Sequence, residues 1–99
     1  MIQVWFRQGV LWDLISEAHE GFRQVVKAAK EDIYVTSGRD GQHLPHSFHY
    51  TGRAWDMRKS GFTKTRLLKI LNGINPKHRW QVIDHGTWFH IELDNMEGE

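Results

Sequence analysis

Residues 47–58 read SFHYTGRAWDMR, and this stretch determines how the rest of the chain is interpreted. Residues 53–58 are interpreted as a β-strand, and from Trp55 to Arg58 apolar and polar side chains alternate, as in a strand with one buried face. One face carries Ala54, Asp56 and Arg58, and the other carries Trp55 and Met57. We therefore expect Trp55 and Met57 to face a core and Asp56 to lie on the opposite face. His49 precedes this strand, in a long loop that spans residues 37–51.

The flanking segments predict two helices and three more strands. Apolar residues three and four positions apart predict an amphipathic helix over residues 11–29, although Gly21 weakens its middle. Thr63 or Thr65 is expected to cap a second helix that runs towards Ile74. Strands are expected over 32–36, 79–84 and 88–93, the last with His90 on its polar face. This order predicts an α+β fold, a small, largely antiparallel sheet with helices packed on one side, as one domain over residues 1–99.

The composition excludes several classes of site. The chain of 99 residues has no cysteine, so neither a disulfide nor a thiolate metal site is available. The formal net charge is +1, from 13 basic and 12 acidic residues. A nucleic-acid-binding protein, with tryptophans for stacking and lysines for phosphates, is the weakest hypothesis because such proteins usually carry a strong basic patch. The basic cluster of Lys59, Lys64, Arg66 and Lys69 is expected to be a solvated helix face.

No segment approaches the roughly 20 continuous apolar residues of a membrane span. The N-terminus shows no basic start followed by an apolar run and a small-residue cleavage site. We therefore expect synthesis in the cytoplasm without a signal peptide, and action elsewhere only after release.

Three residues carry donors that suit a metal ion. His49 lies in the loop, Asp56 on the polar face of one strand and His90 on the polar face of the last strand. If those two strands are neighbours, the three side chains converge. Two imidazoles and one carboxylate, with the fourth position left to water, are typical of catalytic zinc. The chain has seven histidines, and His19 and His78 are interpreted as ordinary surface residues.

The run S-x-H-x-x-G-x-A-x-D from Ser47 to Asp56 resembles the signature of the zinc D-Ala-D-Ala carboxypeptidases. That family includes phage L-alanyl-D-glutamate endolysins and vancomycin-resistance dipeptidases, and is more distantly similar to the hedgehog signalling domain. All five fixed positions match, and the resemblance covers about residues 33–93. Val35 to Gly41 and the final hairpin are similar to the phage-type members.

The resemblance implies a hedgehog/DD-peptidase-like fold and one zinc ion per chain, held by His49, Asp56 and His90. It implies hydrolysis of peptidoglycan stem peptides by metal-activated water, of the D-Ala-D-Ala carboxypeptidase or the L-Ala-D-Glu endopeptidase type. A phage or prophage enzyme that acts on the cell wall after release fits the expected lack of a signal peptide. Arg39 either binds substrate and stabilises the oxyanion or is a solvated loop arginine. Ser47 either binds substrate or braces the loop.

The sequence departs from the family at the general base. Many relatives carry an acid three positions before the last ligand, where this chain has Thr87, and Trp88 replaces the first residue of a His-x-His pair. The remaining candidates are Asp84, which has the right chemistry and is preferred, and His85, which lies closer to the aligned position. His43 and His46 either line the cleft or are exposed in the loop. The alternative function is a catalytically impaired, zinc-stabilised domain that binds cell wall or protein. The scissile bond and the oligomeric state stay open.

Overall fold

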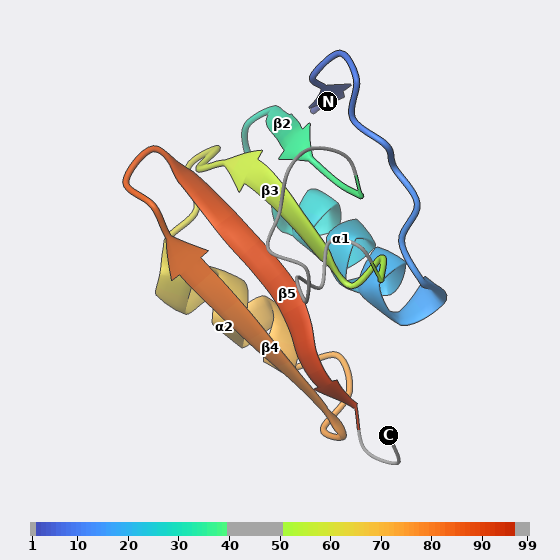
Figure 1. The fold of residues 1–99 in the computed structure, drawn as a ribbon. Helices are drawn as coiled ribbons and strands as arrows, with labels where there is room; N and C mark the ends of the chain where they lie inside the picture. The colour runs from blue at the N-terminus through green and yellow to red at the C-terminus, as the bar shows by residue number, and fades with distance from the viewer. Residues whose placement is uncertain (1, 40–50, 97–99) are drawn as a thin grey trace.

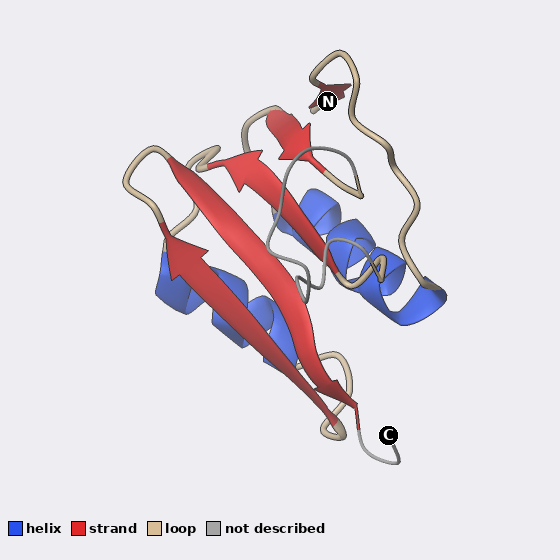
Figure 2. Cartoon of the chain, in the orientation of Figure 1, coloured by secondary structure: helices blue, strands red, loops and turns tan. Residues whose placement is uncertain are grey.

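A computed structural model describes residues 2–39 and 51–96. The elements follow one another as β1 (Val4–Phe6), α1 (Ser16–Ala28), β2 (Ile33–Ser37), β3 (Ala54–Arg58), α2 (Lys64–Asn72), β4 (His78–Asp84) and β5 (Trp88–Met96). Figure 1 shows the two helices behind one face of the sheet, and Figure 2 shows the same layers by element type. We refer to the other side of the sheet as the open face.

The five strands form one sheet in the order β1-β2-β3-β5-β4. Only β1 and β2 run parallel, and the other neighbours are antiparallel. The structure thus confirms an α+β fold with a largely antiparallel sheet and helices on one side. Strand β1 was not predicted, because its three residues are too few to show a strand period. The Asp32 carboxylate stabilises it by accepting hydrogen bonds from Gln3 N at 2.8 Å and Trp5 Nε1 at 3.3 Å.

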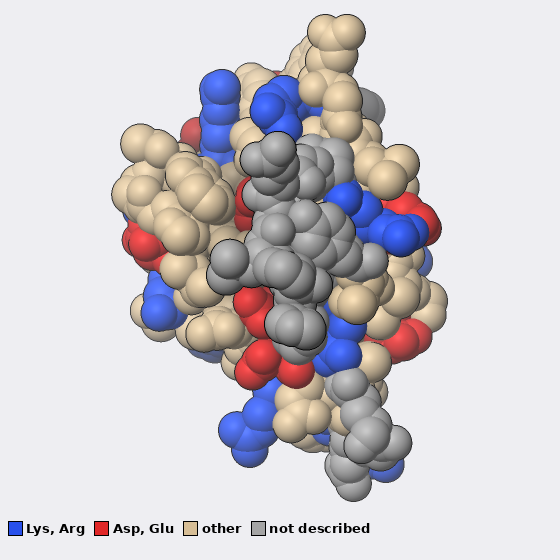
Figure 3. Space-filling view, viewed as in Figure 1, with Lys and Arg blue, Asp and Glu red and all other residues tan. Residues whose placement is uncertain are grey.

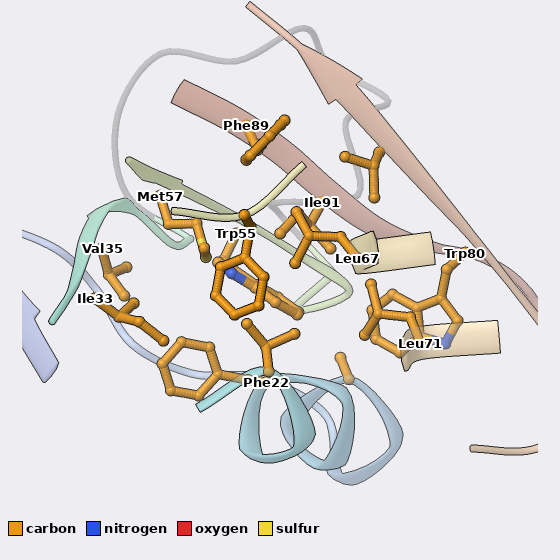
Figure 4. Close-up of a cluster of buried hydrophobic side chains, with 14 of the residues drawn as sticks. Phe22, Ile33, Val35, Trp55, Met57, Leu67, Leu71, Trp80, Phe89 and Ile91 are labelled. Atoms are coloured by element: carbon orange, nitrogen blue, oxygen red, sulfur yellow. The ribbon is translucent and has the colours of Figure 1, made fainter. Parts of the chain in front are cut away.

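The core lies between the sheet and the helices, with Trp55 near its centre (Figure 4). The Trp55 ring is fully buried, and it meets Phe22 of α1 edge-on at 5.4 Å and Trp80 of β4 at 5.9 Å between ring centroids. Met57 is also fully buried and belongs to the same core, whereas Ala54 and Asp56, which alternate with these two residues, are buried on the other face. Because a slip of one residue would turn Trp55 to the open face, this packing fixes the register of β3.

Helix α1 begins at Ser16, five positions later than the apolar spacing from residue 11 predicted. The preceding residues bond to distant segments instead of forming helical turns. Leu11 O accepts a hydrogen bond from Arg39 N, and Ile15 N donates to Gly52 O. Sequence spacing does not reveal these long-range bonds.

Gly21 in α1 has a packing role that its low helix propensity conceals. A Cβ atom at this position would lie 2.3 Å from Cη2 of the buried Trp80 ring. The missing side chain therefore lets α1 approach β4 closely.

The second helix agrees with its prediction, since the Thr63 hydroxyl accepts a hydrogen bond from Arg66 N at 3.2 Å and caps α2. Neither helix in the described part of the chain has the length and apolar character to cross a membrane.

Candidate metal centre

Strands β3 and β5 place Asp56 and His90 directly opposite each other. They are register partners in the antiparallel pair, between the partners Trp55–Ile91 and Met57–Phe89. Those four flanking side chains are fully buried on the helix side. Alternation along both strands therefore turns Asp56 and His90 to the open face. The structure confirms the condition set by the sequence, that the strands carrying these two residues are neighbours.

The side chains of Asp56 and His90 are in hydrogen-bond contact. Nδ1 of His90 lies 2.9 Å from Oδ1 of Asp56, and Nε2 lies 2.8 Å from Oε1 of Glu92. The three side chains are 11–15% exposed, so water screens these interactions only weakly. Burial lowers the pKa of His90, but its hydrogen bonds with Asp56 and Glu92 outweigh burial and raise the pKa above the usual value.

An open hollow of about 690 Å³ borders Asp56 on the open face. Its other described lining residues are Arg7, Thr36, Ser37, Arg58, Thr87 and Trp88. Two guanidinium groups, three hydroxyl groups and one indole ring give it a polar and partly cationic wall. Over the described part of this face, basic and acidic side chains are interspersed (Figure 3). Such a hollow suits a ligand that has both an anionic group and hydrogen-bonding peptide groups.

The third proposed ligand, His49, lies outside the described residues, as do Ser47, His43 and His46. Among residues 2–39 and 51–96, no three His, Cys, Asp or Glu side chains are arranged to hold a metal ion. Asp56 and Glu92 contact opposite nitrogens of His90, so these two carboxylates do not share one ion with the ring. A metal held by Asp56 and His90 therefore needs a donor from elsewhere in the chain.

The geometry of Asp56 and His90 fits two ligands of a tetrahedral zinc ion. Ligand atoms about 2.0–2.1 Å from zinc lie about 3.3 Å apart. The observed contact of 2.9 Å between Oδ1 and Nδ1 is close to that value. Small side-chain rotations would open it, and the oxygen and nitrogen donors suit zinc.

Glu92 was not among the site residues expected from the sequence. Its hydrogen bond to Nε2 leaves Nδ1 as the ring nitrogen on the Asp56 side. Histidine ligands of metals ordinarily donate their second N–H to such an acceptor. The sequence could have indicated Glu92 as a neighbour of His90, because residues two positions apart in a strand lie on the same face of the sheet.

Asp84, the preferred general base, lies on the helix side of the sheet. Its register partner is Phe89, a fully buried core residue, and directly opposed partners share a face. The Asp84 carboxylate pairs with Lys59 Nζ at 2.9 Å and accepts a hydrogen bond from Gly86 N at 2.8 Å. The hydrogen bond from Lys59 is the main cause that lowers the pKa of Asp84 below its usual value, which makes it a weaker proton acceptor.

His85, the other candidate base, lies in the turn between β4 and β5. Its ring stacks on Trp88 at 3.9 Å between centroids, with the planes 12° apart. Trp88 lines the hollow beside Asp56. His85 thus stacks on a residue that lines the hollow, but it is not itself one of the described lining residues.

Arg39 forms an ion pair with Asp13, through Nη1 and Oδ2 at 2.5 Å. Its backbone N also donates to Leu11 O, which ties the segment after β2 to the segment before α1. Gly52 adopts a positive φ of 71°, and a Cβ there would lie 2.7 Å from Asp13 O. The positive φ and the close approach to Asp13 therefore explain why a glycine occupies this position of the motif.

In comparisons with known proteins, no family model, curated protein or solved structure matches this chain.

Proposed function

We propose that the chain is a zinc-dependent peptidase with a hedgehog/DD-peptidase-like fold that hydrolyses peptidoglycan stem peptides. The peptide bond that it cleaves is the D-Ala-D-Ala bond, as in a carboxypeptidase, or the L-Ala-D-Glu bond, as in an endopeptidase. The enzyme acts on the cell wall after release from the cytoplasm. The observation that carries the proposal is the contact between Asp56 and His90 on the open face, beside a polar hollow. The motif from Ser47 to Asp56 adds His49 as the third ligand.

In this proposal His49, Asp56 and His90 hold one zinc ion, and Glu92 orients the His90 ring through its bond to Nε2. When bound, zinc supplies Lewis-acid polarisation of the scissile carbonyl and acidifies a water molecule. The walls of the hollow position the peptide next to Asp56.

His85 is the better candidate for the proton transfer. It takes the proton from the attacking water on its imidazole and delivers it to the leaving amine. Its ring stacks on Trp88, which lines the hollow, whereas Asp84 lies across the sheet and is paired with Lys59. Histidine is also the side chain that ordinarily changes charge near neutral pH.

Two observations favour a second function, a zinc-stabilised domain that binds cell wall or protein without cleaving it. The position where relatives carry the acid is Thr87, and Asp84 is on the opposite face of the sheet from His90. If His85 does not transfer protons, the site retains its metal and its hollow but lacks a base.

Digestion of purified peptidoglycan tests the proposal. The wild type is compared with His90→Ala and with His78→Ala, a control histidine on β4 away from the pair. We expect new amino and carboxyl termini from the wild type and from His78→Ala, and none from His90→Ala or after chelation. Zinc-loaded wild type that pulls down peptidoglycan but releases no fragments would favour the binding domain.

A further inference from the structure

Arg58 is the cation best placed to bind a substrate on the described open face. It lies two residues after Asp56 in β3, so both side chains are on the same face of the sheet. Both residues line the same hollow. Residues two apart in a strand have Cα atoms about 6.6 Å apart, so a group bound by Arg58 lies about one to two residues of extended peptide from Asp56.

An aromatic ring on β2 contacts the Arg58 side chain. The guanidinium carbon lies 5.3 Å from the centroid of the Tyr34 ring on β2, within cation–π range. On the other side, Arg58 is the register partner of Trp88 on β5. Stacking on a ring orders the guanidinium plane and leaves its N–H groups available at the edge, which reduces the entropy lost when a ligand binds.

No carboxylate in residues 2–39 and 51–96 forms an ion pair with Arg58. Glu31 and Asp32 border a neighbouring hollow that Arg58 also lines. The Asp32 carboxylate is already engaged by Gln3 N and Trp5 Nε1. Arg39, by contrast, pairs with Asp13. Compared with Arg39, the Arg58 guanidinium therefore has no carboxylate partner within the described residues. Arg7 lines the same hollow as Arg58 and adds positive charge to it.

We infer that Arg58 binds the free α-carboxylate of the residue that follows the scissile bond. This inference rests on the proposed function, because it takes Asp56 and His90 to mark the scissile carbonyl. In a D-Ala-D-Ala terminus, the last residue carries a free α-carboxylate. In an L-Ala-D-Glu linkage continued through the γ-carboxyl, the D-Glu residue carries one as well. Both bonds therefore present an anion one residue after the scissile carbonyl, and a guanidinium recognises it through paired N–H···O bonds.

Peptides that differ only in this carboxylate test the inference. The probes are N-acetyl-D-Ala-D-Ala, L-Ala-D-Glu with its γ-carboxyl group blocked as a methylamide, and the matching α-amides, added to the zinc-containing protein. The variants are Arg58→Ala, Arg58→Lys and Arg39→Ala, with Arg79→Ala as a control at an exposed position on β4. KM and kcat are measured where a peptide is cleaved, and Kd is measured by NMR titration where it is not.

In the wild type we expect at least one acid to bind about 10-fold or more tightly than its amide, in KM or Kd. Arg58→Ala should remove this difference, with the main effect on KM, and Arg58→Lys should restore part of it. The acid that shows the preference identifies the bond. An acid preference that survives Arg58→Ala and is lost in Arg39→Ala would overturn the inference in favour of Arg39. Equal binding of acid and amide by the wild type would overturn it as well.

The outcomes separate this inference from the proposed function. Cleavage with no effect of Arg58→Ala contradicts the inference alone. Binding without cleavage, with a preference for the acid that depends on Arg58, contradicts the peptidase and retains the carboxylate site.

Discussion

His90 lies directly opposite Asp56 in the β3–β5 ladder, and its Nδ1 is 2.9 Å from the Asp56 carboxylate. The fully buried side chains of Trp55, Met57, Phe89 and Ile91 enforce this pairing from the other face of the sheet. The aromatic core thus determines where the polar pair stands. The hydrogen bond from His90 Nε2 to Glu92 continues the chain of contacts along β5.

Replacement of Glu92 tests its role in orienting His90. We expect Glu92→Ala to weaken zinc binding about 10- to 100-fold, because the ring loses the acceptor that fixes its orientation. Glu92→Gln, which retains a carbonyl oxygen, should lose less. Zinc affinity is measured by competition with a chromophoric chelator, and Gln81→Ala, at the register partner on β4, is the control. Unchanged affinity in Glu92→Ala would show that the His90–Glu92 bond does not support the ligand.

The stability of the zinc-free protein should depend on pH through His90. Its pKa in the folded protein is raised above the ordinary value of 6.5. The protonated ring therefore stabilises the fold fully below pH 6.5, and this contribution is lost as the pH rises through the folded pKa. Thermal unfolding of chelator-treated wild type and His90→Gln, from about pH 5.5 to about pH 8.5, measures it. The Tm advantage of the wild type should shrink with increasing pH, and an advantage that grows instead would contradict the assignment.

Gly21→Ala should destabilise the fold, although alanine is the better helix former by about 1 kcal/mol. Its Cβ would lie 2.3 Å from Cη2 of Trp80, a rigid ring that is 7% exposed. We expect a net loss of about 1–3 kcal/mol in the free energy of unfolding, measured with urea. Trp80→Phe removes the ring atoms involved, so Gly21→Ala should cost less in that background. If Gly21→Ala lowers the free energy of unfolding equally in the wild type and in Trp80→Phe, the destabilisation does not come from the contact with the Trp80 ring.

Two single substitutions discriminate between the candidate bases. If His85 transfers the proton, His85→Gln should lower kcat on stem peptide by about 100-fold or more, with bound zinc unchanged. Asp84→Asn should change kcat by less than about twofold, because it breaks an exposed ion pair with Lys59 that contributes little. The opposite ranking of the two variants would return the role to Asp84.

Local alternation was enough to predict most of the strands. The bulky residues Trp55 and Met57 marked the buried face of β3, and the same reasoning placed His90 on the polar face of β5. The start of α1 was not predictable, because the residues before Ser16 bond to Arg39 and Gly52, which are far along the chain. Such bonds override the apolar spacing.

The base could not be chosen from sequence for a related reason. The face occupied by Asp84 follows from its pairing with Phe89, which depends on the register of the β4–β5 hairpin. Arg58 and Glu92 were visible as polar residues two positions from Asp56 and His90. Their contacts with Tyr34 and with the His90 ring required the neighbouring strands to be placed.

The amount of zinc bound per chain tests the metal centre most directly. The protein is purified without chelator, and metal is measured in the wild type, His49→Ala, His90→Ala and the control His78→Ala. We predict about one zinc per chain in the wild type and in the control, and none in the other two variants. A wild type that stays folded and binds no zinc, even after zinc is added, would contradict the site formed by His49, Asp56 and His90.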